Sequence, residues 1–388
     1  MKALRWHGKH HIDVDQVPDP TIEDPTDMII QVKASGICGS DLHLYDGFIP
    51  TMKKGDILGH EAFGEVVETG RQVNRFRKGD RVAVPFNISC GVCYYCKRGL
   101  FSLCDNSNPN AAEAAKVYGF SPAGYFGYSH LFGDFAGGQA EFLRVPFADQ
   151  IPMTIPDGVD DEDAVLLTDN FPTGYMAAEN CEITEGDTVA VFGAGSVGQF
   201  AAQSALLLGA GRVLLIDRFD YRLTQWEDER ITPINYEGQD VLAKIKELTD
   251  GHGPDACIDA VGMEAHGDTL AGVYDSVKTT LRMETDRPTA LRWVIQACRK
   301  GGTVSVPGVY GGFIDKYPMG AFFNKGLTMR TGQTHVHKYL PRLLQLIVDG
   351  RVKPSIVITH RITLDEAPDY YRIFRDKKDG CLKTIIKF

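Results

Sequence analysis

One segment, residues 188–216, constrains the fold of this chain more than any other. The apolar run Thr-Val-Ala-Val-Phe at 188–192 is typical of a buried strand, and residues 196–208 have helical spacing of small and apolar side chains. A second apolar run follows at 212–216. Two parallel strands need a crossover between them, so this segment is predicted to be a βαβ unit of a parallel sheet.

The turn between the first strand and the helix carries the pattern G-x-G-x-x-G. Gly193 would allow a tight turn, Gly195 would let a pyrophosphate approach the backbone, and Gly198 would let the helix pack closely on the strand. The helix N-terminus, at Ser196 and Val197, offers free N–H groups to phosphate. The motif in this context predicts a dinucleotide site, although a glycine-rich turn without nucleotide remains an alternative.

An acidic residue, Asp217, ends the second strand. It is predicted to accept hydrogen bonds from the adenosine ribose hydroxyls. Its charge would repel a 2′-phosphate, so NAD is favoured over NADP. The adjacent Arg218 could reach a 2′-phosphate, which leaves NADP as an alternative.

The length of 388 residues, and the change from a strand-rich first third to alternating strands and helices, predict two domains. Further strands are expected at 256–259 and 303–306, separated by helical sequence, which predicts a doubly wound parallel sheet. The first third is rich in strands, at 28–34, 62–68 and 81–84. A helix is expected to begin at 160–164. Near the C-terminus we expect a helix at 340–348 and strands at 356–358 and 383–387, which return to the first domain.

Charge and hydropathy exclude several functions. A net charge of −10 argues against a nucleic-acid surface. No apolar run is long enough for a membrane span, and the N-terminus has no signal-peptide core. The expected location is the cytoplasm, where clustered cysteines suggest a metal before disulfides.

Four of the nine cysteines form such a cluster, Cys90-x2-Cys93-x2-Cys96-x7-Cys104. Zinc is tetrahedral and accepts four thiolates, and a closed shell of sulfurs leaves no place for water. The lobe at 87–105 is therefore predicted to hold a structural zinc. An iron–sulfur cluster and disulfides are alternatives for the same cysteines.

A second set of metal ligands is scattered. Cys38 and His60, in the β-rich part, offer a thiolate and an imidazole. Taken alone, a single cysteine is usually part of a core and a single histidine is usually at the surface. Spacing by itself therefore gives only weak support for a catalytic metal.

The motifs together resemble those of the zinc-containing medium-chain alcohol dehydrogenases. They are CGSDLH (38–43), GHE (59–61), KGDRV (78–82), the four-cysteine lobe and GAGSVG (193–198), in that order. The resemblance implies an α/β fold with a GroES-like β-rich catalytic domain, interrupted by a Rossmann domain with a doubly wound parallel sheet. It implies domain limits of 1–165 with 338–388 for the first, and 166–337 for the second.

Within the family, the chain looks most like the glutathione-independent formaldehyde dehydrogenase and dismutase branch. This rests on TDNFPTGY (168–175), GGQAEF (137–142) and a long insertion at about 263–289. By resemblance, Cys38, His60 and Asp169 would bind a catalytic zinc, with Glu61 behind them or as an occasional ligand. In the branch, a comparable insertion covers the adenine end of NAD and can trap it; a plain surface loop is the alternative.

The resemblance also assigns roles to individual residues of the reaction. Ser40 and His43 would relay the proton released from the substrate; a surface histidine is the alternative interpretation of His43. Thr173 would lie under the nicotinamide, Arg222 near the adenosine ribose and Val309 near the carboxamide. Phe86 and Phe135 are candidate walls of the substrate pocket, or ordinary core residues.

The sequence therefore predicts a zinc-dependent oxidoreductase with two zincs per chain. It would pass a hydride from a short alcohol or hydrated aldehyde to NAD. A polyol or sugar dehydrogenase of the same superfamily is the nearest alternative, and a non-catalytic NAD-binding protein is another. A zinc-free quinone reductase would lack both metal sets. A homodimer or homotetramer is expected by resemblance, with residues 310–312 and 327–331 pairing across subunits.

Overall fold

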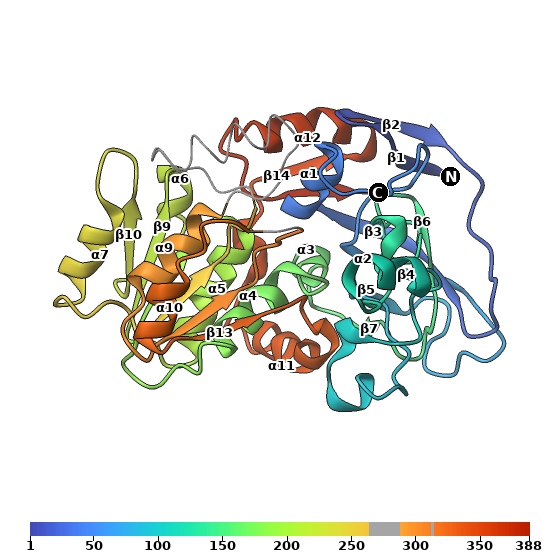
Figure 1. The fold of residues 1–388 in the computed structure, drawn as a ribbon. Helices are drawn as coiled ribbons and strands as arrows, with labels where there is room; N and C mark the ends of the chain where they lie inside the picture. The colour runs from blue at the N-terminus through green and yellow to red at the C-terminus, as the bar shows by residue number, and fades with distance from the viewer. Residues whose placement is uncertain (264–287, 312–313) are drawn as a thin grey trace. The chain divides into compact units, whose positions relative to one another are not determined.

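The computed structural model describes residues 1–263, 288–311 and 314–388, which form two compact units (Figure 1). The first unit contains Met1–Pro172 and His335–Phe388, and the second contains Thr173–Thr334. The first unit thus extends past residue 165 and includes Asp169. The predicted insertion lies, apart from its ends, outside the described residues, and so does Gly312.

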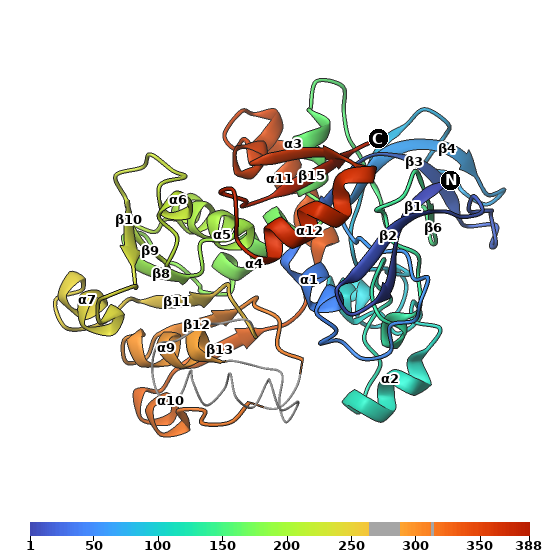
Figure 2. The same ribbon diagram turned by 90° about the horizontal axis from the view of Figure 1, so that it is seen from above.

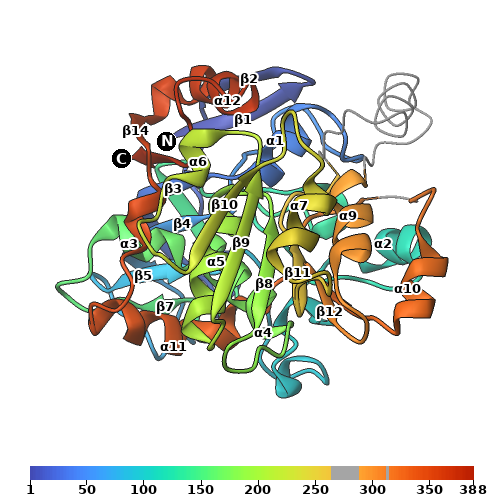
Figure 3. The ribbon, with the colours of Figure 1, turned by 90° about the vertical axis from the view of Figure 1, so that its left-hand side faces the viewer.

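The second unit is built on a six-stranded parallel sheet. The strand order is β10-β9-β8-β11-β12-β13, as Figure 3 shows for the first five. Every neighbouring pair is parallel, so the predicted doubly wound sheet is confirmed. The strands are β8 (Thr188–Phe192), β9 (Arg212–Asp217), β10 (Ile231–Asn235), β11 (Ala256–Asp259), β12 (Thr303–Val306) and β13 (Thr328–Thr331).

Helices cover both faces of this sheet because side chains alternate along each strand. Val189 and Val191 pack in a core with α5 (Ser196–Leu207). Ala190 and Phe192 point the other way, into a core with α7 (Val241–Leu248) and α9 (Thr289–Ala297). The remaining helices with residues in this unit are α4 (Asn170–Glu179), α6 (Asp220–Leu223) and α10 (Met319–Lys325).

The first unit contains a seven-stranded sheet of order β14-β15-β3-β4-β5-β7, with β6 also paired to β3. The C-terminal strand β15 pairs antiparallel with β3, so the expected return of the chain to its first domain is confirmed. A hairpin of β1 (Lys2–Gly8) and β2 (His11–Gln16) stands beside it (Figure 2). The sheet strands are β3 (Met28–Ile37), β4 (Ala62–Thr69), β5 (Arg81–Val84), β6 (Phe142–Val145), β7 (Met153–Thr154), β14 (His360–Thr363) and β15 (Thr384–Lys387).

Short helices connect these strands. They are α1 (Gly39–Tyr45), α2 (Ala111–Tyr118), α3 (Asp161–Leu166), α11 (Val336–Val348) and α12 (Ala367–Arg375), with 3-10 turns η1 (Cys96–Arg98), η2 (Phe101–Leu103), η3 (His130–Phe132), η4 (Pro354–Val357) and η5 (Leu364–Glu366). The strand predicted at 356–358 is wrong. Pro354 begins a 3-10 turn there, because its fixed φ suits the first position of a helical turn. The helix predicted at 340–348 begins earlier, at Val336.

Among the described residues, no helix has both the length and the apolar character that crossing a membrane requires.

Candidate active site and metal centres

The four clustered cysteines lie together in the first unit. Their Sγ atoms are all within 4.8 Å of one another, and those of Cys93 and Cys104 are 4.0 Å apart. Four sulfurs bound to one tetrahedral zinc are about 3.8 Å apart, so the donor set fits zinc. None of the nine cysteines, all of which the structure describes, forms a disulfide.

Hydrogen-bond donors surround these sulfurs. The backbone N–H of Cys90 donates to Cys104 Sγ at 3.3 Å, and Asn106 Nδ2 donates to Cys90 Sγ at 3.3 Å. A hydrogen bond from Cys96 lowers the pKa of Cys104 to about 4. Burial raises the pKa of Cys90, and the hydrogen bond to Cys104 raises that of Cys96, so without a metal the thiolate form is favoured at Cys104.

A second cluster brings together residues from distant parts of the first unit. The ligand atoms of Cys38, His60, Glu61 and Asp169 are all within 4.8 Å of one another. Asp169 Oδ2 lies 3.5 Å from Cys38 Sγ and 3.2 Å from His60 Nε2. A tetrahedral zinc would hold an oxygen ligand about 3.5 Å from sulfur and about 3.3 Å from nitrogen. The spacing fits a zinc bound by these three residues.

The electrostatics of this cluster also favour a cation. Burial raises the pKa of Cys38, and the neighbouring Asp169 raises it further. Burial alone would lower the pKa of His60, but Asp41 and Asp169 raise it on balance. The parts of these two shifts that come from Asp41 and Asp169 reflect closely spaced carboxylates, whose negative charge a divalent ion would offset.

Asp41 has a role that the sequence interpretation missed. Its Oδ1 lies 3.0 Å from Nδ1 of His60, and its Oδ2 accepts the backbone N–H of Cys38 at 2.9 Å. A carboxylate on the far nitrogen of a metal-binding histidine fixes the ring and its tautomer. An acidic residue three positions after Cys38 also forms a capping box at the start of α1, and that pattern could have identified it.

Glu61 is held by two side chains that the sequence also did not single out. Lys383 Nζ lies 2.6 Å from both carboxylate oxygens, and Asn170 Nδ2 lies 2.9 Å from Oε1. Burial disfavours the charged ammonium, but Glu61 raises the pKa of Lys383 on balance. A Cβ at Gly36 would lie 1.9 Å from Glu61 Oε2, so only glycine fits beside this ion pair.

The two predicted relay residues lie on α1. Ser40 Oγ is 3.4 Å from His60 Nε2, which places its hydroxyl at the edge of the cluster. His43 is buried, which argues against a surface histidine, and it follows Ser40 by three positions on the same helix. Their role in proton transfer stays a prediction.

The second unit contains the glycine-rich turn in the predicted setting, between β8 and α5. Gly193 has φ +94°, and a Cβ on Gly198 would lie 1.8 Å from the Gly193 carbonyl oxygen. Both positions therefore require glycine. A Cβ on Gly195 would meet no described atom within 4 Å, and Ser196 and Val197 begin α5 there. The open position at Gly195 is where a phosphate can approach the backbone.

Asp217 ends β9 beside this turn. Its Oδ2 accepts the N–H of Ala194 at 2.7 Å, and Arg222 Nη1 lies 3.7 Å from the same oxygen. Arg218 lies over the ring of Phe219, 4.6 Å from its centroid. Gln199, missed in the sequence, binds the carbonyl oxygens of Ala194 and Arg222. The turn, α5 and α6 are thus tied together around the predicted adenosine end.

The residues predicted to lie near the nicotinamide are in the same unit. Thr173 Oγ1 lies 2.8 Å from Thr334 Oγ1. The Val309 carbonyl accepts the N–H of Met263 at 2.9 Å. Asp259, at the end of β11, accepts the Tyr310 hydroxyl at 2.7 Å. These bonds hold the ends of β11 and β12 next to each other, where dinucleotides bind in this type of sheet.

The two predicted pocket walls differ in position. Phe86 packs edge-on against His60, with ring centroids 6.0 Å apart. Phe135 instead packs against Phe126 and the core of the first unit. Three other aromatic residues continue from Phe86, namely Tyr125, Tyr128 and Phe132.

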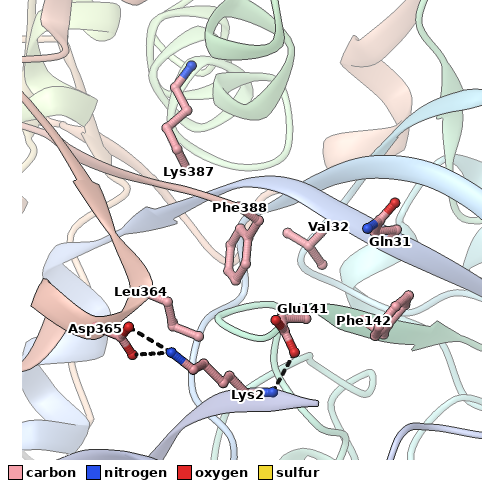
Figure 4. Close-up of a pocket in the computed structure, with 9 residues that line it drawn as sticks. All are labelled: Lys2, Gln31, Val32, Glu141, Phe142, Leu364, Asp365, Lys387 and Phe388. Atoms are coloured by element: carbon pink, nitrogen blue, oxygen red, sulfur yellow. Dashed lines mark hydrogen bonds and ion pairs between the residues drawn. The ribbon is translucent and has the colours of Figure 1, made fainter.

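A separate surface pocket in the first unit contains none of these residues (Figure 4). It is lined by Lys2, Gln31, Val32, Glu141, Phe142, Leu364, Asp365, Lys387 and Phe388. Lys2 is paired with Asp365 at 2.7 Å, and Lys387 is paired with Glu162 at 2.8 Å. Its charges are already satisfied within the chain, so it is not the candidate active site.

Comparison with known proteins defines the family. The alcohol dehydrogenase GroES-like domain family matches residues 24–157, and the zinc-binding dehydrogenase family matches residues 196–285. A zinc-type alcohol dehydrogenase-like protein of Bacillus subtilis is 40% identical over the full length of both chains. The chain belongs to the zinc-type alcohol dehydrogenase family.

Two curated relatives carry more specific names. A glutathione-independent formaldehyde dehydrogenase of Bacillus subtilis is 35% identical over 92% of this chain and 86% of its own length. A formaldehyde dismutase of Pseudomonas putida is 33% identical over 96% of this chain and 94% of its own. The predicted resemblance to this branch is confirmed.

Solved structures agree with this fold. Alcohol dehydrogenase TADH from Thermus sp. ATN1 has a TM-score of 0.81 and 33% identity, covering 100% of this chain and 99% of its own. A zinc-dependent alcohol dehydrogenase from Streptococcus pneumonia has a TM-score of 0.82 and 28% identity, covering 100% and 98%. The first unit is the GroES-like domain and the second is the Rossmann domain of this oxidoreductase family.

Proposed function

We propose that the protein is a zinc- and NAD-dependent dehydrogenase that takes a hydride from a short alcohol or hydrated aldehyde. The observation that carries this proposal is the cluster of Cys38, His60 and Asp169. It combines one thiolate, one imidazole and one carboxylate at spacings that suit zinc, and it leaves a fourth tetrahedral position for a substrate. Charge balance supports the same assignment, since one thiolate and one carboxylate neutralise Zn²⁺.

The chain's own residues would bind and orient the reactants. Zinc would supply a Lewis acid, and NAD would supply the hydride acceptor. Asp41 holds the His60 ring, and Lys383 with Asn170 holds the Glu61 carboxylate behind the ligands. These contacts fix the cluster before a substrate arrives, which lowers the reorganisation needed during reaction.

A proton must leave this buried site when an alcohol is oxidised. Ser40 Oγ, at the edge of the cluster, would accept it, and His43, three positions later on the same helix, would be the next proton acceptor. A His43→Gln variant should turn over more slowly near neutral pH and recover at high pH. Kinetics equal to the wild type at both pH values would remove His43 from the path.

In the second unit, the turn from Gly193 to Gly198 would bind the pyrophosphate and Asp217 the adenosine ribose. Gly195→Ala should raise the dissociation constant of NAD without lowering the melting temperature, because the added Cβ meets only open space in the protein. Gly198→Ala is the contrasting variant. Its Cβ would collide with the Gly193 carbonyl, so the fold of the unit itself should be destabilised.

The first experiment is metal analysis and an absorbance spectrum of the protein as purified, followed by an assay of NADH formation. Two zincs, a bound nicotinamide and activity on formaldehyde would support a formaldehyde-type enzyme, with dismutation as the next assay. Two zincs with exchangeable NAD would favour an ordinary alcohol or polyol dehydrogenase. Bound NAD without hydride transfer to any alcohol or aldehyde would instead indicate a non-catalytic NAD-binding protein.

We also propose a homodimer or homotetramer. Strand β13 is the terminal strand of the described parallel sheet, and Thr328 and Thr331 in it are exposed. Such an edge can pair with a second chain. Light scattering coupled to gel filtration would measure the mass, and a monomer at micromolar concentration would contradict the proposal.

A further inference from the structure

Two tyrosine hydroxyls beside the metal cluster make no hydrogen bond within the part of the chain that the structure describes. Tyr125 is only 4% exposed, and Tyr128 is half-buried. Neither hydroxyl is among the fully enclosed side-chain polar atoms that lack a partner, so each reaches space that is open to a ligand. A polar group that binds there gains a hydrogen bond that an alkyl group cannot make. Burial raises the pKa of both tyrosines, so both remain neutral hydroxyls that can donate and accept.

These tyrosines are connected to the metal cluster through a chain of aromatic contacts. The His60 ring packs edge-on against Phe86, and the Tyr125 ring packs edge-on against Phe86 at 5.4 Å. Tyr128 lies 6.3 Å from Tyr125, and the charges of His60 and Asp41 act on its hydroxyl. The two rings therefore lie on the side of the cluster that Phe86 occupies, and the Tyr128 hydroxyl is close enough to be affected by the charges of His60 and Asp41.

Backbone hydrogen bonds hold this arrangement in place. The Phe86 N–H donates to the Thr168 carbonyl, next to Asp169, and the Phe126 N–H donates to the Phe86 carbonyl. The Tyr125 N–H donates to the Phe132 carbonyl at 2.9 Å. The tyrosines are thus tied to the segment that carries the Asp169 ligand, and their position does not depend on a free loop.

A charged contact anchors the other end of the tyrosine loop. His130 Nε2 lies 3.1 Å from Asp56 Oδ1 and 2.9 Å from Asp134 Oδ1. Asp56 precedes the His60 ligand on the same connection between β3 and β4. The loop is therefore fastened on both sides of the tyrosines to segments that carry metal ligands.

We propose that Tyr125 and Tyr128 are specificity-determining residues that bind a second oxygen of the substrate. The inference rests on the proposed function, in that the first oxygen occupies the metal cluster. An alkyl group in the same place would leave both hydroxyls without a partner, whereas a hydroxyl would satisfy them. The site then favours small diols, whether geminal as in an aldehyde hydrate or vicinal, over alkanols of equal size.

Pairs of substrates of nearly equal shape test this directly. Methanediol, the hydrate of formaldehyde, differs from ethanol by a hydroxyl in place of a methyl group, and ethylene glycol differs from propan-1-ol in the same way. The ratio of kcat/KM for diol over alkanol is measured in the wild type and in Tyr125→Phe, Tyr128→Phe and the double variant. We expect the ratio to fall about fivefold to tenfold per hydroxyl removed.

A fall in the methanediol/ethanol ratio indicates that the site binds a geminal diol, and a fall in the ethylene glycol/propan-1-ol ratio indicates a vicinal diol. A ratio that stays within twofold of the wild type for both pairs in the double variant overturns the inference. Tyr94→Phe is the matched control, because Tyr94 is exposed on the cysteine lobe and its variant should leave both ratios unchanged. A general loss of packing would lower kcat/KM for diol and alkanol alike and would leave the ratio unaltered.

A binding measurement separates this inference from the proposed function. The dissociation constants of ethylene glycol and propan-1-ol are determined by NMR titration of the metal-containing protein without cofactor. If the wild type oxidises none of the four compounds, the proposed function fails. A preference for ethylene glycol that disappears in the double variant still supports the tyrosine subsite, and equal affinities in both proteins overturn it.

Discussion

The two metal clusters of the first unit are built in opposite ways. The lobe draws four identical ligands from residues 90–104, whereas the second cluster draws three different ligands from residues 38, 60 and 169. Local turns are sufficient to bring the cysteines together. The second cluster needs the end of β3, the start of β4 and the segment before α4 to be in their final places.

The two sets of ligands suit different roles, one structural and one catalytic. A closed shell of four thiolates leaves no room for a substrate, so its zinc would contribute only stability. The mixed cluster is surrounded by orienting groups, Asp41, Asn170 and Lys383, that a purely structural site would not require. The predictions that follow test whether activity and stability divide between the two clusters in this way.

The largest effect is expected from Asp169→Ala. Loss of this ligand removes the carboxylate that lies 3.5 Å from Cys38 Sγ and 3.2 Å from His60 Nε2, and kcat/KM should fall by roughly a thousandfold or more. Metal analysis should show one zinc fewer, with the melting temperature little changed. Retention of full zinc content and turnover would place the active site elsewhere.

The reverse result is expected from Cys104→Ser. The lobe should lose its zinc, and the melting temperature should fall on the order of 10 °C, because metal binding and folding are coupled. The surviving folded protein should keep the second metal and its activity per mole of folded enzyme. Val92, which precedes Cys93 and is exposed, provides a control position. Val92→Ala should change neither the zinc content nor the melting temperature.

A smaller effect is expected from Asp41→Asn. The variant keeps an oxygen that can accept the Cys38 N–H but loses the charge beside His60 Nδ1. Affinity for the catalytic metal should fall about tenfold to a hundredfold, with the lobe unaffected. Competition with a chromophoric chelator measures the zinc affinity of both clusters. An equal loss of affinity at both would contradict the separate roles of the two clusters.

The smallest effect concerns His337, whose Nε2 lies 3.3 Å from Ser89 Oγ beside the lobe. Burial, with a smaller contribution from the charge of His335, lowers the pKa of His337 to about 3. The folded pKa is below the unfolded value of about 6.5, so the unfolded state binds the proton first, and stability is lost as pH falls below about 6.5.

His337→Gln should remove this dependence. The wild type should lose roughly 1 kcal/mol more stability than the variant between pH 7.5 and 5.5, seen as a larger drop in melting temperature. His252→Gln, at an exposed position, should behave as the wild type. Equal pH profiles for the wild type and His337→Gln would mean that His337 is accessible to protons in the folded state.

The features that could be predicted from the sequence are those that depend on residues close together along the chain. The βαβ unit, the glycine turn and the cysteine lobe are each encoded within about 30 residues, and their expected positions agree with the structure. The fold of the first unit and its ligand set came instead from resemblance. Spacing alone cannot bring Cys38 and Asp169 together, because their proximity depends on sheet pairing over long sequence distances.

Around the second metal cluster, the groups that the sequence missed all contact a ligand, Glu61 or Asp41. Lys383 reaches Glu61 across 322 positions of the chain, and no local pattern marks such a lysine as buried. Asn170 and Gln139 were within recognised motifs, yet only the structure shows that their amides contact Glu61 and Asp41. The 3-10 turn at Pro354 was missed because the apolar residues 356–358 resemble a strand, whereas the fixed φ of Pro354 favours a helical turn.

The pairing of β15 with β3 has a consequence for protein synthesis. Ile37 of β3 pairs with Thr384, so this part of the sheet cannot form until Thr384 has been translated. At about 5–20 residues per second, the delay is roughly 20 to 70 seconds. Lys383 is translated next to Thr384, so its ion pair with Glu61 forms equally late. Until then residues 34–37 of β3 have an open edge, the kind of edge that can pair with other chains.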